Sequence, residues 1–385
     1  MADNKDKKVL NVPHLRFPEF SGEWEKKRFK DVCNITTGNK NTQDKSDDGI
    51  YPFYVRSQNV ERINSWTFDG EAILTAGDGV GVGKVFHYST GKIGVHQRVY
   101  ILSDFKCDGK YLYSYFAGNF YNRVKRMSAK NSVDSVRMEM IADMPISLPS
   151  TMEQKKIGHL LALLDERIAT QNKIIEDLKK LKSAISKHLF ARKDLLETTI
   201  CLSNIATLKN GYAFQSSKYN ALGKWKILTI TNVSGERYIN DEDCNCIINL
   251  PNDIQDHQVL KEGDILISLT GNVGRVSLCK NGDYLLNQRV GLLQLAKNVN
   301  QEFLYQILSS QKFENSMIAC GQGAAQMNIG KGDVESYVLP YSSNGNNILW
   351  VAKILHSYDE CIINEMRRLT LLTMQKQYLL TQMFI

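Results

Sequence analysis

Several features that would assign this chain to a familiar class are missing from its 385 residues. It has no run of about 18 apolar residues, which excludes a membrane-spanning helix. The opening stretch MADNKDKKVL is charged and has no apolar segment, which argues against a secretion signal. The eight cysteines include no CxxC pair, so we expect reduced thiols rather than disulfides or zinc ligands. We therefore expect a cytoplasmic protein.

Familiar catalytic and ligand-binding motifs are absent as well. The seven histidines show no HExxH spacing, and the seven prolines include no adjacent pair, which excludes the Asn-Pro-Pro-aromatic signature of amino-group DNA methyltransferases. The Gly-rich stretch 77–85 lacks the Gly and the Ser or Thr of a phosphate-binding loop and the third Gly of a dinucleotide-binding turn. We expect a tight turn there and in the matching stretch 270–276, with contact to a DNA backbone as the alternative. The sequence predicts no catalytic residue, no metal site and no cofactor.

Length and composition indicate a globular protein with two domains. A chain of 385 residues is too long for one ordinary core, and its 43% hydrophobic and 23% charged content is that of a soluble protein. The net charge of +7 is unevenly spread, since residues 1–200 hold 32 Lys and Arg against 25 Asp and Glu, whereas residues 201–385 hold 16 of each. A mild basic excess fits a polyanionic partner.

What the sequence does have is a long amphipathic helix at 152–192. This stretch contains no Pro and no Gly beyond Gly158, and it is rich in strong helix formers. Alternating steps of four and three residues from Ile157 mark ten positions, of which eight are apolar. A helix of 41 residues is about 60 Å long at 1.5 Å per residue. Its apolar seam needs a partner of matching length.

The partner lies in the same chain. Adding 194 to each position gives a second series in the C-terminal stretch, in which eight of ten positions are again apolar and the two polar interruptions fall at the same steps. Two unrelated helices would rarely have polar interruptions at the same steps. The chain therefore looks like a duplicated unit in which each copy ends in a long helix. The predicted core of the helix pair is Ile157, Leu161, Leu164, Ile168, Ile175, Leu178, Ile185, Leu189, Val351, Leu355, Tyr358, Ile362, Leu369, Leu372, Leu379 and Met383.

The segments before the helices repeat too. FKDVCNITTG at 29–38 corresponds to LSNIATLKNG at 202–211, and HQRV at 96–99 corresponds to NQRV at 287–290. The offset grows from 173 to 191, which places an inserted loop near 236–262. We predict an α+β chain in which two homologous mixed α/β domains are separated by two long helices that form a coiled coil. Connectivity favours an antiparallel pair, because the second domain begins where the first helix ends and its own ends are expected to lie close together.

This arrangement resembles the specificity subunit of type I restriction-modification enzymes over nearly the whole chain. The resemblance is carried by PHLRFPEFSGEWE at 13–25, by EQKKIGHLLALLDERI at 153–168, and by a Gly-rich turn followed by a Gln-Arg-Val strand in each copy. The second helix start departs from the pattern and reads SSNGNNILWVAKIL. The resemblance implies target-recognition domain 1 at 1–150, spacer helix 1 at 151–195, target-recognition domain 2 at 196–342 and spacer helix 2 at 343–385.

The resemblance also implies a non-catalytic, DNA-binding subunit of a defence against foreign DNA. Each domain would read one half of a bipartite site in double-stranded DNA, while the helices set the gap between the halves and dock two modification (methyltransferase) subunits. Adenine methylation with S-adenosylmethionine would occur in those partners, and translocation and cleavage with ATP and Mg in restriction (translocase) subunits. No membrane is implied. The alternative is a helical scaffold or adaptor that binds protein partners and not DNA.

Base and phosphate contacts favour cationic, amide and hydroxyl side chains on loops. The candidates in domain 1 are Arg56, Ser57, Gln58, Asn59, Lys84, Gln97, Arg98, Arg123, Lys125, Arg126 and Lys130. The candidates in domain 2 are Lys209, Tyr212, Thr231, Asn232, Asn272, Arg275, Gln288, Arg289, Gln322 and Asn328. For Gln97 and Gln288 the alternative is that a residue recurring in both copies holds the shared fold. The uneven charge predicts that domain 1 carries more of the salt-dependent affinity.

Overall fold

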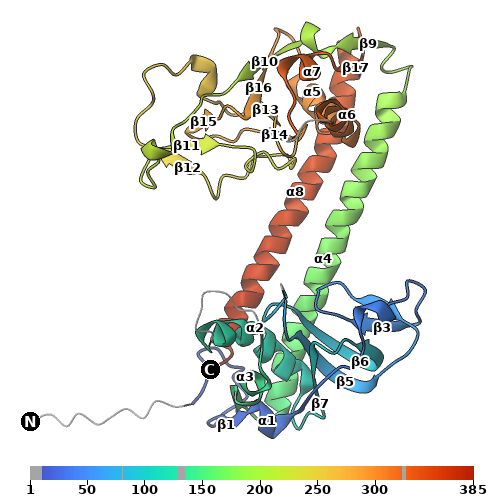
Figure 1. The fold of residues 1–385 in the computed structure, drawn as a ribbon, viewed down its shortest axis with the longest axis vertical. Coiled ribbons are helices and arrows are strands. Elements are labelled where there is room, and N and C mark those ends of the chain that lie inside the picture. Colours follow the sequence, from blue (N-terminus) through green and yellow to red (C-terminus); the bar gives the residue numbers. More distant parts are fainter. Residues whose placement is uncertain (1–10, 80, 128–134, 323–326) are drawn as a thin grey trace, which may run out of the picture. The chain divides into compact units, whose positions relative to one another are not determined.

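The computed structural model describes residues 11–79, 81–127, 135–322 and 327–385, and the chain divides into two compact units (Figure 1). Unit 1 comprises Met1–Asn172 and Arg367–Ile385, and unit 2 comprises Lys173–Met366. Each unit therefore includes part of both long helices. No helix among the described residues combines the length and the hydropathy needed to cross a bilayer.

Unit 1 is built on a six-stranded sheet in the order β2-β7-β5-β6-β3-β4, antiparallel except where β3 meets β6. Its strands are β2 (Asn34–Thr37), β3 (Tyr51–Tyr54), β4 (Glu61–Ile63), β5 (Phe68–Ala76), β6 (Phe86–Val95) and β7 (Val99–Ser103). A separate ladder joins β1 (Glu25–Arg28) to β8 (Pro145–Leu148) and so ties together the two ends of the domain. The helices are α1 (Phe29–Val32), α2 (Gly109–Met127) and α3 (Met138–Ala142).

The main core of unit 1 lies where α2 meets the sheet. The buried aromatics Tyr111 and Tyr115 lie one helical turn apart on α2, as do Phe116 and Phe120, which gives the helix one apolar face. That face packs in one cluster with Ile73 of β5 and Leu102 of β7. The hydrophobic effect of burying these aromatic side chains fixes α2 against the sheet.

Unit 2 repeats this plan with shorter strands. One sheet has the order β10-β16-β13-β14 and a second the order β12-β11-β15, while β9 pairs with β17. The strands are β9 (Thr198–Cys201), β10 (Ala206–Asn210), β11 (Trp225–Leu228), β12 (Asn245–Ile247), β13 (Ile265–Ser268), β14 (Val276–Leu278), β15 (Tyr284–Leu286), β16 (Val290–Leu295) and β17 (Val338–Tyr341). The helices are α5 (Gln301–Leu308), α6 (Gln311–Gly321) and α7 (Lys331–Glu335).

The strand orders confirm the predicted duplication. The order β10-β16-β13-β14 reproduces β2-β7-β5-β6, and the β9–β17 ladder reproduces β1–β8. Two differences matter for the sites described below. The inserted residues of unit 2 fall within two segments, 229–244 and 248–264, on either side of β12. Moreover, α2 is continuous in unit 1, whereas the corresponding part of unit 2 breaks at Ser309 and Ser310 into α5 and α6.

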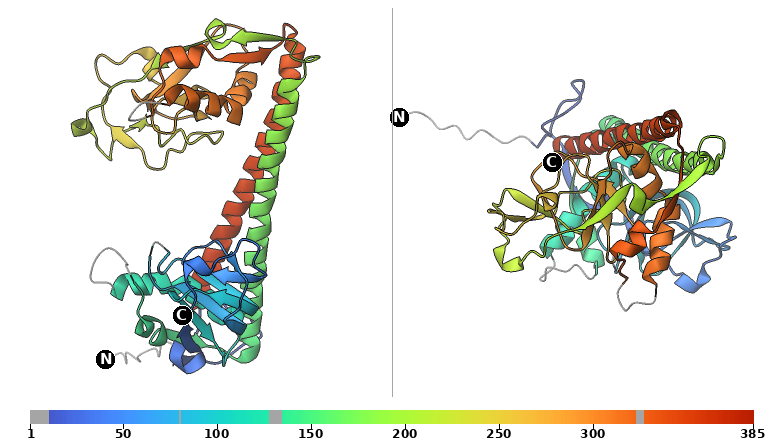
Figure 2. Two further views of the ribbon diagram at one scale, coloured as in Figure 1. Left: turned by 45° about the vertical axis from the view of Figure 1, so that its right-hand side comes forward. Right: turned by 90° about the horizontal axis from the view of Figure 1, so that it is seen from above.

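The two long helices are α4 (Thr151–Ala191) and α8 (Gly345–Gln382), and they are antiparallel within each unit (Figure 2). In unit 1 the core contains Leu161 from the start of α4 and Met383, which directly follows α8. In unit 2 it contains Leu189 from the end of α4 and Val351 from the start of α8. None of the sixteen predicted seam residues is exposed. The predicted fold class is therefore confirmed.

The lysine that interrupts the seam in each long helix also has a structural explanation. Lys376 of α8 pairs with Asp165 of α4 in unit 1, and Lys182 of α4 pairs with Asp359 of α8 at 2.6 Å in unit 2. Asp165 and Asp359 lie 194 residues apart, as do Lys182 and Lys376. The two ion pairs are therefore copies of one contact, and each fixes the antiparallel register of its own unit.

Candidate nucleic-acid interface

The most closely repeated feature of the two domains is a corner, here called the Gln-Arg corner, formed by residues 96–98 in unit 1 and 287–289 in unit 2. In unit 1 it joins β6 to β7. The backbone N–H of Gln97 donates to Lys40 O at 2.8 Å, and the N–H of Gly77 donates to Arg98 O at 2.8 Å. The corner is thus fastened on both sides by main-chain bonds.

Unit 2 reproduces these bonds with different residues. The N–H of Gln288 donates to Tyr212 O at 3.0 Å, and the N–H of Leu269 donates to Arg289 O at 3.1 Å. The close approach of the neighbouring glycine is also repeated, because a Cβ atom on Gly38 would lie 2.2 Å from Val95 O and one on Gly211 would lie 2.2 Å from Asn287 O. The corner is therefore one structure built twice.

The first residue of the corner explains why His in one copy can replace Asn in the other. The N–H of Arg98 donates to Nδ1 of His96 at 3.0 Å, and the N–H of Arg289 donates to Oδ1 of Asn287 at 3.2 Å. Both side chains supply the same acceptor. Burial, reinforced by the charge of Arg56, lowers the pKa of His96, which keeps the imidazole neutral and Nδ1 able to accept.

The Gln and Arg side chains of the corner are exposed in both units. Gln97 donates from Nε2 to Asn41 Oδ1 at 2.6 Å, whereas the bonds that hold the corner come from the backbone and from the residue before the glutamine. The recurrence of Gln97 and Gln288 is thus not required by the corner's own hydrogen bonds. Their contact with DNA stays a prediction.

In unit 1 a carboxylate pairs with two of the predicted DNA-binding arginines beside the corner. Asp78, in the Gly-rich turn, pairs with Arg56 at 2.9 Å and with Arg98 at 3.6 Å. In unit 2 the corresponding residue is Thr270, and Arg289 has no ion-pair partner among the described residues. The sequence alone does not single out Asp78. A carboxylate between two arginines can hold both guanidinium groups in place while lowering the local positive charge.

The Gly-rich turn is tight in both copies, as expected. Gly79 and Gly271 have φ of 81° and 69°, and Gly83 and Gly274 have φ of 67° and 78°, a region that side chains rarely occupy. The residue after Gly83 and the residue after Gly274 are both cationic. Lys84 lies over the ring of Tyr121 at 5.2 Å, and Arg275 contacts Glu314 at 3.4 Å.

The cationic end of α2 lies beside this turn, because Gly83 approaches Tyr121 and Val124. Lys125 and Arg126 are exposed there, and Lys125 follows Tyr121 by one turn on the same helix face. Arg123 is half-buried and donates to Met140 O at 2.8 Å, so it also anchors the turn before β8. Lys130 lies outside the described residues. The exposed candidates Ser57, Gln58 and Asn59 follow β3 in the same loop as Arg56.

The remaining candidates of unit 2 have mixed surroundings. Thr231, Asn272, Gln322 and Asn328 are exposed, and Lys209 is half-buried on β10. The Tyr212 hydroxyl donates to Asp253 at 2.8 Å.

Asn232 differs from these residues because its side chain faces inward. The residue is 4% exposed, donates from Nδ2 to Asn240 O at 2.8 Å and accepts from the N–H of Thr229 at 2.7 Å. This arrangement assigns Asn232 to holding the inserted segment.

A buried ionic cluster, the Arg237 cluster, joins that inserted segment to the helices of unit 2; its members are Arg237, Glu302, Asp359, Lys182 and Gln306. Arg237 donates to both oxygens of Glu302 at 2.9 and 2.6 Å and to Asp359 at 2.9 Å. Gln306 donates to Asp359 at 2.6 Å, and Lys182 pairs with its other oxygen. Burial alone would lower the pKa of Arg237, but Glu302 and Asp359 raise it above its ordinary value. The guanidinium therefore stays charged in the interior.

Sequence reasoning missed this cluster because Glu302 and Asp359 are 65 and 122 residues from Arg237. The one available signal was the aspartate shared by both helices, Asp165 and Asp359. Within the described residues, no group of three or more His, Cys, Asp or Glu side chains is arranged to hold a metal ion.

Comparison with known proteins assigns the chain to a protein family. The model of the type I restriction modification DNA specificity domain matches residues 21–180 and again residues 197–374. The chain belongs to this family and carries two copies of its domain.

Two characterised relatives agree with this assignment. The chain is 29% identical over 167 residues to the specificity subunit of the type I restriction enzyme EcoDI from Escherichia coli, a match that covers 42% of this chain and 37% of that subunit. It is 27% identical over 351 residues to the type I restriction enzyme MjaVIII specificity subunit of Methanocaldococcus jannaschii, covering 81% of this chain and 80% of that one.

Solved structures share the fold. The S subunit of a type I restriction-modification system from M. genitalium aligns with a TM-score of 0.66 at 17% identity, covering 97% of this chain and 99% of that chain. A chain from a structure of the complex assembly and conformational transition of a type I R-M system aligns with a TM-score of 0.53 at 13% identity, covering 96% and 98%. At these identities the likeness shows the fold alone.

Proposed function

We propose that this chain is the specificity subunit of a type I restriction-modification complex and that each of its domains reads one half of a bipartite site in double-stranded DNA. The observation that carries the proposal is the Gln-Arg corner, built twice from equivalent main-chain bonds with exposed Gln and Arg side chains at the same two positions. Amide and guanidinium groups are the side chains best suited to read base edges in the major groove.

The long helices have two parts in this proposal. Their length sets the gap between the two half-sites, and their surfaces dock two modification subunits. The chain itself is non-catalytic and holds no cofactor. The partner subunits supply adenine methylation with S-adenosylmethionine, while restriction subunits supply ATP- and Mg-dependent translocation and cleavage. Such a role places the chain in the cytoplasm, where the chromosome of a prokaryotic cell lies.

The direct test uses the complete chain with its modification subunits. A plasmid library of random sequence is exposed to the subunits with and without this chain, and methylated positions are mapped by sequencing. The proposal predicts methylation at one bipartite motif only when the chain is present. Methylation that is absent, or independent of this chain, would favour the adaptor alternative.

A further prediction concerns the salt dependence of DNA binding. Replacing Lys84, Lys125 and Arg126 by Ala should reduce the slope of log affinity against log salt by about 0.9 for each phosphate that the variant no longer neutralises, or about 2.7 if all three side chains bind phosphates. Arg123 is left unchanged because it anchors Met140 O. The measurement is a salt titration of the assembled complex on its own site.

The matched control replaces three exposed lysines of unit 2, namely Lys218, Lys224 and Lys297, by Ala. Residues 201–385 have no net charge, so we expect this triple variant to change the slope by less than about one. An equal slope in the wild type and in the unit 1 variant would refute the assignment of these cations to phosphates.

A further inference from the structure

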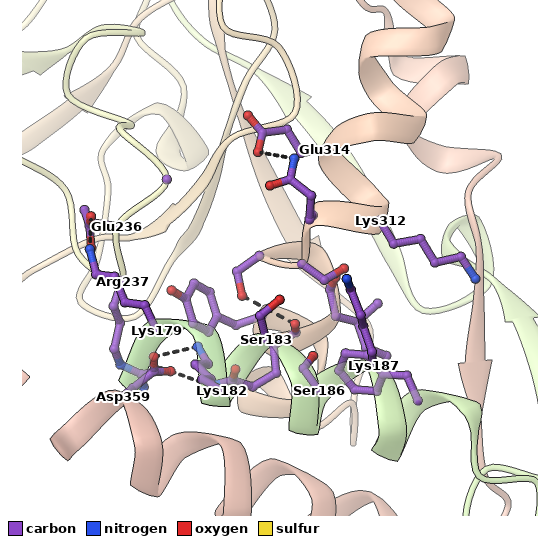
Figure 3. A pocket seen from close by; sticks show the side chains of 18 of the residues that line it. Lys179, Lys182, Ser183, Ser186, Lys187, Glu236, Arg237, Lys312, Glu314 and Asp359 are labelled. Carbon is purple, nitrogen blue, oxygen red and sulfur yellow. Dashed lines mark hydrogen bonds and ion pairs between the residues drawn. The ribbon is translucent and has the colours of Figure 1, made fainter. Parts of the chain in front are cut away.

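Unit 2 contains a cavity of about 750 Å³ beside the Arg237 cluster (Figure 3). One wall is the end of α4, with Ser183, Ser186 and Lys187, and the opposite side includes Lys312 of α6. Ser310, which directly precedes α6, also lines the cavity. This volume lies within the range of about 300–1,000 Å³ that is typical of ligand sites.

In unit 1 a larger side chain, Leu380, occupies the corresponding place. The repeat places Leu380 where unit 2 has Ser186, and Gly118 where unit 2 has Ser310. Leu380 belongs to the unit 1 core and packs over Gly118, with its Cδ2 atom 3.5 Å from the position of a Cβ on that glycine. The continuous α2 passes this point, whereas α5 and α6 are separated by the two serines. The cavity thus lies where Ser186 replaces the leucine of the first copy and where the helix corresponding to α2 is broken.

The charge of the cavity wall is strongly unbalanced. Seven cationic side chains line it, against three carboxylates. Of the cations, Lys187, Lys193 and Lys312 form no ion pair with any described residue. The lining also includes apolar side chains of the two long helices, among them Phe190 and Ile362. An occupant that complements both features carries carboxylates and at least one apolar side chain.

We propose that this cavity binds an acidic, partly apolar peptide segment of a modification subunit, and that it does so once per chain because Leu380 takes the place of Ser186 in unit 1. The proposal rests on the proposed function, which supplies the partner. A free inorganic anion would leave the apolar part of the lining exposed to water. Duplex DNA is recognised through its wide grooves and exposed phosphates, whereas the apolar part of this site lies inside a concave pocket.

The test is the assembly of the full-length chain with purified modification subunits, measured by isothermal titration. The double variant Lys187→Glu and Lys312→Glu should weaken assembly by about tenfold or more, because it turns two attractive contacts into repulsive ones. The matched control, Lys218→Glu with Lys297→Glu, reverses two exposed lysines of unit 2 that lie outside the long helices and do not line the cavity. It should assemble like the wild type.

A second variant separates shape from charge. Ser186→Leu copies Leu380 of unit 1 and places a larger side chain in the cavity wall without altering its charge, so it should also weaken assembly by about tenfold. Because the variant side chain enters existing space, circular dichroism should report the wild-type melting temperature. A photoreactive amino acid at position 186 should cross-link to an acidic segment of a single modification subunit per chain.

The outcomes are distinguishable. Wild-type assembly by both the charge-reversed and the Ser186→Leu chains would overturn the proposal for the cavity while leaving the proposed function intact. Unchanged assembly of these variants, combined with weaker DNA binding of the complex, would show that the cavity binds DNA. That result would overturn the proposal that it binds a peptide. If the wild-type chain itself did not assemble, the proposed function would fail, and this proposal with it.

Discussion

Removing seven residues from each long helix will move the two half-sites about three base pairs closer in the sequence that the assembled complex methylates. The stretches to delete are 171–177 in α4 and 365–371 in α8, which correspond in the repeat and lie between the two ion pairs. Seven residues are about 10 Å of helix at 1.5 Å per residue, and a base pair rises about 3.4 Å.

The deletion is designed to keep the helix pair intact. After it, Ile168 precedes Leu178 by three positions and Ile362 precedes Leu372 by three, so the alternating pattern of the seam continues. Two full turns are removed, which rotates the flanking parts of a helix by only about 20° relative to one another. The pairs Asp165–Lys376 and Lys182–Asp359 are retained.

Methylome sequencing reads the result directly. The half-site sequences should be unchanged and the gap between them shorter. A control chain in which the same two heptads are replaced by others of equal length and polarity should keep the original gap. A shortened chain that methylates with the original gap would show that the helices do not set the spacing.

The second large effect is expected from Asp359→Ala, which should destabilise unit 2 by about 3–5 kcal/mol, because it removes the buried carboxylate that pairs with both Arg237 and Lys182. Asp359 and Arg237 side chains are each 8% exposed and lie 2.9 Å apart. The substitution also removes acceptors used by Lys182 and Gln306. Arg237 would retain Glu302, but the link from the inserted segment to α8 would be broken.

The repeat provides a matched control. Asp165 occupies the equivalent place in unit 1, where its side chain is 35% exposed and pairs with Lys376, 24% exposed. Asp165→Ala should cost less than about 1 kcal/mol, as expected of an ion pair open to solvent.

Native-state hydrogen exchange followed by mass spectrometry can report on each unit separately. In the Asp359→Ala chain, amides of α5 should exchange more than about a hundred times faster, since about 1.4 kcal/mol corresponds to a factor of ten. Amides of α2 should be unaffected. Equal and small effects of the two substitutions would contradict a structural role for the Arg237 cluster.

The parts of this structure that could be predicted from sequence are those with a local signal or an internal repeat. The helix pair follows from a period of alternating threes and fours, and its antiparallel direction from connectivity. The duplication is visible because HQRV at 96–99 and NQRV at 287–290 occupy equivalent positions in the two halves of the sequence. The strand order and the break between α5 and α6 have no such signal, because they depend on contacts between residues far apart in the sequence.

The same distinction holds within the candidate site. Gln97, Arg98, Gln288 and Arg289 are identified by their recurrence, and the structure places them at one corner in each unit. Asn232 is a candidate by residue type alone, which cannot reveal that its amide faces Asn240. The acceptors that the corner requires, and the cluster around Arg237, emerge only when distant segments are brought together.

The central claim is that each domain reads its own half of the DNA site through its Gln-Arg corner, and it is tested by methylome sequencing of two variants. One carries Gln97→Ala and Arg98→Ala, and the other carries Gln288→Ala and Arg289→Ala. A bidentate side-chain contact to a base discriminates by about 1–3 kcal/mol, so each variant should relax one half of the recognised motif and leave the other half strict. Two variants that relax the same half, or that both retain the full motif, would contradict the account.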